Sequence, residues 1–164
     1  MSEAVAVLVG TTKGAFVVTS ESGRADWTVH GPFCDGWPIN HVIGDASTGR
    51  LWAVGGGAWS GAGVWRTDAS RAEWSLAKLA SGEMDAWVTA NPEEAAGYGL
   101  SPTEPAPFTG EMDALWSIAL CGDHLYAGAK PAMLFRSGDG GATWLKVETL
   151  GAHPSRETWE PGAA

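Results

Sequence analysis

Basic residues and cysteines are scarce in this chain, and each shortage excludes a class of protein. Ten Lys and Arg stand against nineteen Asp and Glu, which gives a formal net charge of −9. Nucleic acids and anionic membranes bind basic surfaces, so we expect neither as a partner. The two cysteines, Cys34 and Cys121, lie far apart and outside any CxxC spacing, and two free thiols are expected rather than a disulfide. The first ten residues have no basic segment and only a short apolar run, so we expect no signal peptide or membrane span and predict a cytoplasmic location.

Glycine and tryptophan, in contrast, are abundant. The 164 residues include 23 Gly and 10 Trp. Glycine disfavours helices but suits tight turns, because it tolerates positive φ. Tryptophan is enriched in strands and buries a large area. The composition therefore predicts an all-β protein of short strands and many turns.

One local motif recurs three times with the same spacing. In each copy a hydroxyl residue precedes a tryptophan by seven positions: Ser137 and Trp144, Thr67 and Trp74, Ser20 and Trp27. Each copy follows a glycine-containing turn and a short apolar strand, and a further strand lies upstream. The repeated unit thus reads strand, glycine turn, strand, polar turn, and a strand that begins with tryptophan.

The spacing of the three tryptophans predicts three units and one insertion. Trp27 and Trp74 are 47 residues apart, which matches a propeller blade of roughly 40 to 50 residues. The next interval is 70, but a pentapeptide that begins at Gly82 recurs at Gly110, 28 positions later. We therefore predict β-propeller blades, about three four-stranded antiparallel sheets in an incomplete ring. The expected parts are blade one at about 4–30, blade two at about 39–79, an irregular proline-rich insertion at about 80–109, blade three at about 114–149 and a tail at 150–164.

The third copy of the motif, S-x-D-x-G-x-T-W, resembles the Asp-box of the BNR-repeat, sialidase-like propellers. The matching residues are Ser137, Asp139, Gly141, Thr143 and Trp144. The resemblance implies a propeller fold and a glycosidase-related or glycan-binding function. For Asp139 we expect a structural role, because an aspartate in a tight turn accepts backbone N–H bonds. The alternative function is that of a non-catalytic scaffold for protein interaction or assembly.

The catalytic set of retaining sialidases cannot be placed on this sequence. That set comprises an arginine triad, a tyrosine nucleophile and acidic partners. Glycoside hydrolysis needs two facing carboxyl groups, and the carboxylates to examine are Asp35, Asp45, Glu111, Asp113 and Glu160. The histidines have no metal-ligand spacing, so no metal and no cofactor are expected.

Residues in or near turns at strand ends form the candidate ligand site. Exposed tryptophan with lysine or arginine suits carbohydrates and small acidic ligands. The candidates are Lys13, Trp37, His41, Trp59, Lys130, Arg156 and Trp159. The alternative is that these tryptophans pack between blades.

Three blades leave two outer faces uncovered, since closed propellers have at least four. We expect those faces to carry Val7, Val9, Phe16, Leu134 and Phe135, and the first sheet to lack its innermost strand. Apolar faces of this kind predict self-association.

Overall fold

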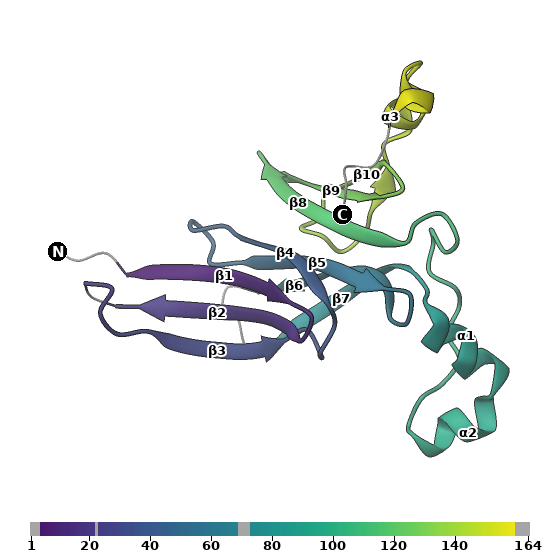
Figure 1. Ribbon diagram of the computed structural model, residues 1–164, viewed down its shortest axis with the longest axis horizontal. Coiled ribbons are helices and arrows are strands. Elements are labelled where there is room, and N and C mark those ends of the chain that lie inside the picture. The colour runs from purple at the N-terminus through teal and green to yellow at the C-terminus, as the bar shows by residue number, and fades with distance from the viewer. Residues whose placement is uncertain (1–3, 22, 69–72, 160–164) are drawn as a thin grey trace.

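Three separate antiparallel sheets form the framework of the computed structural model, which describes residues 4–21, 23–68 and 73–159 (Figure 1). The first sheet has the order β1-β2-β3, with β1 Val5–Thr11, β2 Gly14–Ser20 and β3 Thr28–Phe33. The second has the order β4-β5-β6-β7, with β4 Ile39–Gly44, β5 Leu51–Gly57, β6 Gly61–Thr67 and β7 Trp74–Ala80. The third has the order β8-β9-β10-β11, with β8 Ala114–Cys121, β9 His124–Lys130, β10 Met133–Ser137 and β11 Leu145–Lys146. The prediction of a mostly β protein with three antiparallel sheets of three or four strands is confirmed.

The second sheet lies between the other two, so both of its faces are buried. One face joins a cluster with the first sheet that includes Ala15, Val42, Ala53 and Trp65. The other face joins a larger cluster with the third sheet, in which Val54 and Val64 are fully buried. Alternation along a strand sends neighbouring residues to opposite faces, which is why Val64 and Trp65 belong to different clusters.

The two junctions between sheets use equivalent strands. Strand β1 packs against β4, and β5 packs against β8. In strand order, β1 and β5 are the equivalents that precede a glycine turn, whereas β4 and β8 are the first strands of the sheets that follow. The same sheet-on-sheet relation is therefore formed twice in one chain.

Polar contacts from β4 fix the second junction. The Asn40 side-chain amide donates to the Leu115 carbonyl at 2.8 Å, and the Ile118 N–H donates to His41 Nδ1 at 3.2 Å. Asn40 lies where the register of β4 against β5 shifts, between Ile39 and His41. This bulge turns Asn40 and His41 toward β8.

The segment between β7 and β8, expected to be irregular, contains two helices, α1 Glu83–Ala90 and α2 Pro92–Gly97. The Asp85 carboxylate accepts the Gly82 N–H at 2.7 Å, which satisfies a donor at the start of α1. Pro92 is the first residue of α2, where proline favours a helix start. The proline that suggested a loop thus begins a helix.

The fourth strand of the third sheet, β11, is short. It spans only Leu145–Lys146, and α3, Glu148–Gly151, begins two residues later. A 3-10 turn, η1 Arg156–Thr158, follows. Among the described helices none is long and apolar enough to cross a membrane.

Phe135 was wrongly expected on an uncovered face. Its side chain is fully buried and packs on Phe108, with ring centroids 4.7 Å apart. Phe108 comes from the segment before β8, which closes over this part of the third sheet. Leu134, the neighbour of Phe135 on β10, lies on the opposite face and is half-buried.

Candidate functional site

Hydrogen bonds to Asp139 organise the turn Ser137–Trp144. Its carboxylate accepts the Ser137 hydroxyl at 2.7 Å, the Thr143 hydroxyl at 2.6 Å and the Ala142 and Thr143 N–H groups at 2.9 to 3.1 Å. These donors hold the pKa of Asp139 well below its usual range, the Thr143 hydroxyl contributing most. Both carboxylate oxygens are therefore engaged inside the turn.

The turn Ser20–Trp27 shares two features with the turn Ser137–Trp144. Trp27 Nε1 donates to the Arg24 carbonyl at 3.1 Å, and Trp144 Nε1 donates to the Gly141 carbonyl at 3.2 Å. In both turns the residues three and four positions before the tryptophan have positive φ: Gly23 and Arg24 in the first, Gly140 and Gly141 in the third. In the third turn both positions are glycine, which adopts the left-handed conformation without steric cost.

The hydroxyl residue that begins each turn is buried in all three copies. Ser20, Thr67 and Ser137 expose 3%, 6% and 2% of their surfaces. Residues 22 and 69–72, which belong to the first and second turns, lie outside the part of the chain that the structure describes. The equivalence of the three turns thus extends from spacing to burial.

The third turn also locks the sheets together. Trp52 on β5 donates its indole N–H to the Gly140 carbonyl at 2.9 Å. A pocket of about 340 Å³ lies beside this contact and is lined by Arg50, Arg66, Asp68, Glu73 and Asp139, among others. Because acidic side chains outnumber arginines in this lining, it does not form a simple anion site.

The other end of the sheets collects most of the candidate ligand residues. Strands alternate in direction, so the β1–β2, β5–β6 and β9–β10 turns lie at the same end as the connections that leave β3, β7 and β11. In Figure 1 this is the end of the first and second sheets from which α1 extends. The candidates placed at this end are Lys13, Trp37, Trp59 and Lys130.

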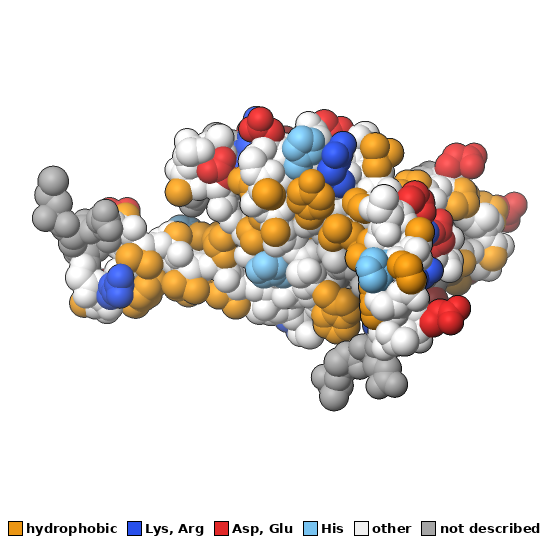
Figure 2. All heavy atoms as spheres, turned by 90° about the horizontal axis from the view of Figure 1, so that it is seen from above, with side chains coloured by type: hydrophobic (Ala, Val, Ile, Leu, Met, Phe, Trp, Pro, Cys, Tyr) orange, Lys and Arg blue, Asp and Glu red, His pale blue; other side chains and the backbone are white. Residues whose placement is uncertain are grey.

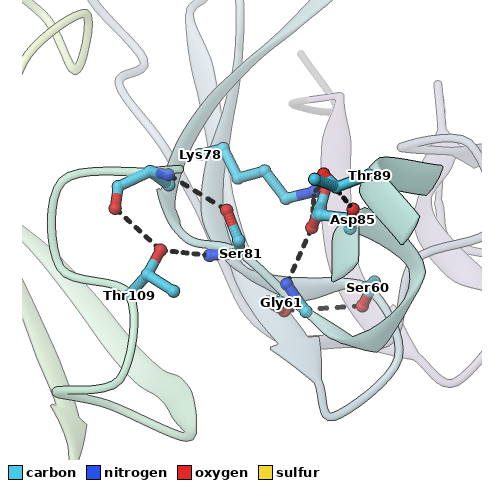
Figure 3. A network of polar contacts seen from close by, with 9 residues as sticks. Ser60, Gly61, Lys78, Ser81, Asp85, Thr89 and Thr109 are labelled. Atoms are coloured by element: carbon cyan, nitrogen blue, oxygen red, sulfur yellow. Dashed lines mark hydrogen bonds and ion pairs between the residues drawn. The ribbon is translucent and has the colours of Figure 1, made fainter. Parts of the chain in front are cut away.

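A compact group forms there around the first turn of α1. Lys78, near the end of β7, donates to both oxygens of Asp85 at 2.5 and 2.6 Å, and its Nζ lies 5.7 Å from the centroid of the Trp37 ring. Figure 3 shows Lys78 reaching across to Asp85 beside Ser60 and Gly61. Trp59 joins the same place, since its carbonyl accepts the Met84 N–H at 3.0 Å. We call Trp37, Trp59, Lys78 and Asp85 the α1 cluster.

Exposure differs within the α1 cluster. The Trp59 side chain is 58% exposed, whereas Trp37 is half-buried and meets the Trp65 ring edge-on at 5.7 Å. Lys78 and Asp85 expose 23% and 20% of their side chains. Trp59 is thus the open aromatic surface of the cluster, and the other three members are largely covered.

The remaining candidates lie apart from this cluster. His41 is used in the contact between β4 and β8, and Lys13 and Lys130 are exposed at turns. Trp159 stacks on His153 at 5.9 Å and donates to Ser155 Oγ, and Arg156 is exposed in η1. Among the described residues, no hydrogen bond, ion pair or ring contact joins Arg156 or Trp159 to the α1 cluster.

The carboxylates considered for hydrolysis are dispersed. Asp45 binds Ser47 and Thr48, which holds its pKa below the usual value, and Glu111 is paired with Lys146 at 2.6 Å. Asp35 and Asp113 are exposed, and Glu160 lies outside the described residues. Neither the pocket beside Gly140 nor a second pocket, lined by residues such as Val17, His30 and Trp74, is lined by any of these carboxylates. The described residues also contain no cluster of three metal-ligating side chains.

Sequence reasoning missed Lys78 and Asp85. Both belong to segments that the sequence analysis singled out: Lys78 lies at the end of a predicted strand and Asp85 lies inside the repeated pentapeptide. Only the helical course of residues 83–90 brings Asp85 back over Lys78. An i to i+7 ion pair across a strand-to-helix junction has no periodic signature.

No known family model matches this chain, and no curated protein matches it either. Function therefore has to be inferred from the residues of the chain itself.

Proposed function

We propose that this chain is a sialidase-like, Asp-box propeller segment whose α1 cluster binds carbohydrate without hydrolysing it. The observation that carries the binding is the open Trp59 indole beside the Lys78–Asp85 pair. The Asp139 turn supports the Asp-box part of the proposal through its hydrogen bonds and through its second copy at Ser20–Trp27.

The chemistry of the α1 cluster suits a sugar. An exposed indole offers a flat apolar face for the C–H groups of a pyranose ring. Lys78 has three N–H donors and uses two on Asp85, which leaves one for a ligand hydroxyl or carboxylate. Lys13, exposed in the β1–β2 turn at the same end, adds positive charge for an acidic sugar.

Binding without hydrolysis follows from the carboxylates. A glycosidase places two carboxyl groups roughly 5 to 10 Å apart across the scissile bond. Asp85 is already paired with Lys78, and the candidates Asp45 and Glu111 are held in local contacts. We therefore expect fluorogenic glycosides, sialosides included, to show no turnover above buffer.

A glycan array probed with labelled protein tests the proposal. The wild-type chain should bind a subset of glycans, and Trp59→Ala should lose at least about tenfold of that signal, the loss of roughly 1.4 kcal/mol of binding free energy. Tyr98→Ala is the matched control, because Tyr98 is an exposed aromatic residue outside the α1 cluster, with 72% exposure. Equal loss in both variants, or no binding by the wild type, would overturn the proposal.

A further inference from the structure

The two junctions between sheets place equivalent residues in equivalent positions. Counting back two residues from the buried hydroxyl of each turn gives Val18, Trp65 and Phe135. Trp65 faces the first sheet with 4% exposure, and Phe135 lies fully buried in the cluster shared with the second sheet. This position therefore packs on the preceding sheet wherever a preceding sheet exists.

The residue one step earlier packs on the following sheet. The equivalents are Val17, Val64 and Leu134. Val17 is 4% exposed and lines a pocket with Leu51 and Trp74 of the second sheet, while Val64 is fully buried in the cluster shared with the third. Leu134 has no following sheet in the described structure and is only half-buried.

The outer side of the first sheet is an uncovered copy of a buried surface. Val7 pairs with Val18, as Ala53 pairs with Trp65 and Ala127 with Phe135. Val7 is 45% exposed, whereas Ala53 and Ala127 are fully buried. Val29, the other partner of Val18, is 62% exposed. We call Val7, Val18 and Val29 the first outer face.

This face lacks the charged side chains of a solvated sheet. Strands β1, β2 and β3 contain no Asp, Glu, Lys or Arg. An antiparallel sheet with one face in water normally alternates apolar and polar residues. Figure 2 shows hydrophobic side chains along the arm that the first sheet forms in Figure 1.

The outer side of the third sheet is the uncovered copy of the opposite surface. Trp116 is 50% exposed, and half-buried Tyr126 and Leu134 share its side of the sheet. Trp116 lies where the register of β8 shifts, as Asn40 does on β4. We call Trp116, Tyr126 and Leu134 the second outer face. Arg136 and Lys130 lie toward its two ends.

We infer that the first outer face of one copy packs on the second outer face of another, so that two copies close head to tail into one ring of six sheets. The two faces are the halves of an interface that the chain already forms twice, which commits the occupant to a second copy. Rings of four to eight sheets are the known range of propellers, and six lies within it. Each copy would contribute one face to each of two identical junctions.

Trp116 fits this arrangement better than an equivalent of Asn40 would. Asn40 reaches the first strand of the following sheet through its amide. The first sheet has only β1, β2 and β3 in the described residues, with no strand on the outer edge of β1. A large indole at position 116 fills the space that such a strand would otherwise occupy.

Sedimentation velocity on the wild-type chain and two charged variants tests this inference. The wild type should sediment as a species with twice the 17.1 kDa mass of one chain. Val29→Glu and Trp116→Glu each place a charge on one outer face at a residue that is already at least half exposed, so the fold should persist in circular dichroism. Each variant alone should lose at least tenfold in association, while Tyr98→Glu, in the insertion, should not.

A mixture of the two variants provides the decisive test. A head-to-tail pair of Val29→Glu with Trp116→Glu keeps one junction free of both charges. The mixture should therefore form a two-chain species at a concentration where neither variant does alone. A wild-type monomer, an open-ended polymer, loss in only one of the two variants, or a mixture that behaves as the sum of its parts would each overturn the inference.

Discussion

Asp139 and Thr143 are joined through both backbone and side chain. The Thr143 hydroxyl donates to Asp139 Oδ2 at 2.6 Å, and the Thr143 N–H lies 3.0 Å from Oδ1. The same aspartate accepts hydrogen bonds from Ser137 and Ala142, so one ionised side chain orders three other residues of the turn. Trp52 then binds the Gly140 carbonyl of this ordered turn, which links the turn to the second sheet.

Replacing Asp139 by asparagine should destabilise the chain. The variant loses the charge and part of the acceptor capacity, and for this exposed carboxylate we expect a loss of about 1 kcal/mol of unfolding free energy. Urea unfolding measures the change, and Asp123→Asn, in the exposed β8–β9 turn, is the control. Equal stability of the wild type and Asp139→Asn would contradict the role of the carboxylate.

Asp139 also predicts a pH dependence. Its pKa is lowered in the folded chain, so its contribution to stability is complete above the unfolded value of about 4 and is lost as the pH falls further. The stability difference between the wild type and Asp139→Asn should therefore shrink between about pH 4 and pH 2. A difference that stayed constant with pH would show that ionisation of Asp139 is not involved.

The two cysteines should differ in reactivity. Both are free, Cys34 buried and Cys121 exposed. Burial raises the pKa of the Cys34 thiol to about 12, so little thiolate exists at neutral pH. A thiol reagent should label one group per native chain and two after denaturation. Labelling of the native Cys121→Ser variant would contradict the burial of Cys34.

Asp85 should hold α1 in place. Asp85→Asn weakens both the Lys78 pair and the bond from Gly82 N–H, and a lost N-terminal helix contact costs roughly 1 kcal/mol. Amide exchange in residues 83–97 should then be several-fold faster, while the sheets stay unchanged. Glu83→Gln, in the same first turn but exposed, should leave the exchange rates as they are.

Glycines 55 and 57 make a matched pair on β5. A Cβ on Gly55 would overlap the Pro38 carbonyl, whereas a Cβ on Gly57 would meet nothing within 4 Å. Gly55→Ala should cost about 3 kcal/mol of stability, since backbone on both sides would have to shift, and Gly57→Ala should be nearly neutral. Thermal melting compares the two. Similar melting temperatures would contradict the close approach of Pro38 and Ile39 to β5.

The three sheets could be predicted from the sequence because the signals that mark their turns are local. Seven-residue spacing from Ser20, Thr67 and Ser137 to a tryptophan marks a turn, and in the Ser137–Trp144 copy the bonds to Asp139 lie within the turn itself. The pentapeptide at Gly82 and Gly110 shows where such reasoning fails: the first copy opens α1, and the second leads into β8. Identical residues take different courses because Lys78 contacts Asp85, whereas the Asp113 N–H binds the Lys130 carbonyl.

The α1 cluster depended on those long-range contacts and could not be predicted as a whole. Trp37 and Trp59 were identified as exposed turn residues, but their shared neighbours come from β7 and α1. Histidine is a residue type that often binds ligands, yet the Nδ1 of His41 accepts a backbone N–H from β8. A turn position predicts access to solvent, and it says little about which side chains meet.

The indole N–H signals in a proton–nitrogen correlation spectrum test the carbohydrate-binding proposal most directly. The chain has 10 tryptophans, and each signal can be assigned by single substitution. On titration with the glycan that binds best, or with sialic acid as the acidic probe, the Trp59 signal should move in proportion to occupancy. The Trp27 signal, at the opposite end of the first sheet, should stay in place. A Trp59 signal that does not move while any of these sugars binds would contradict the account.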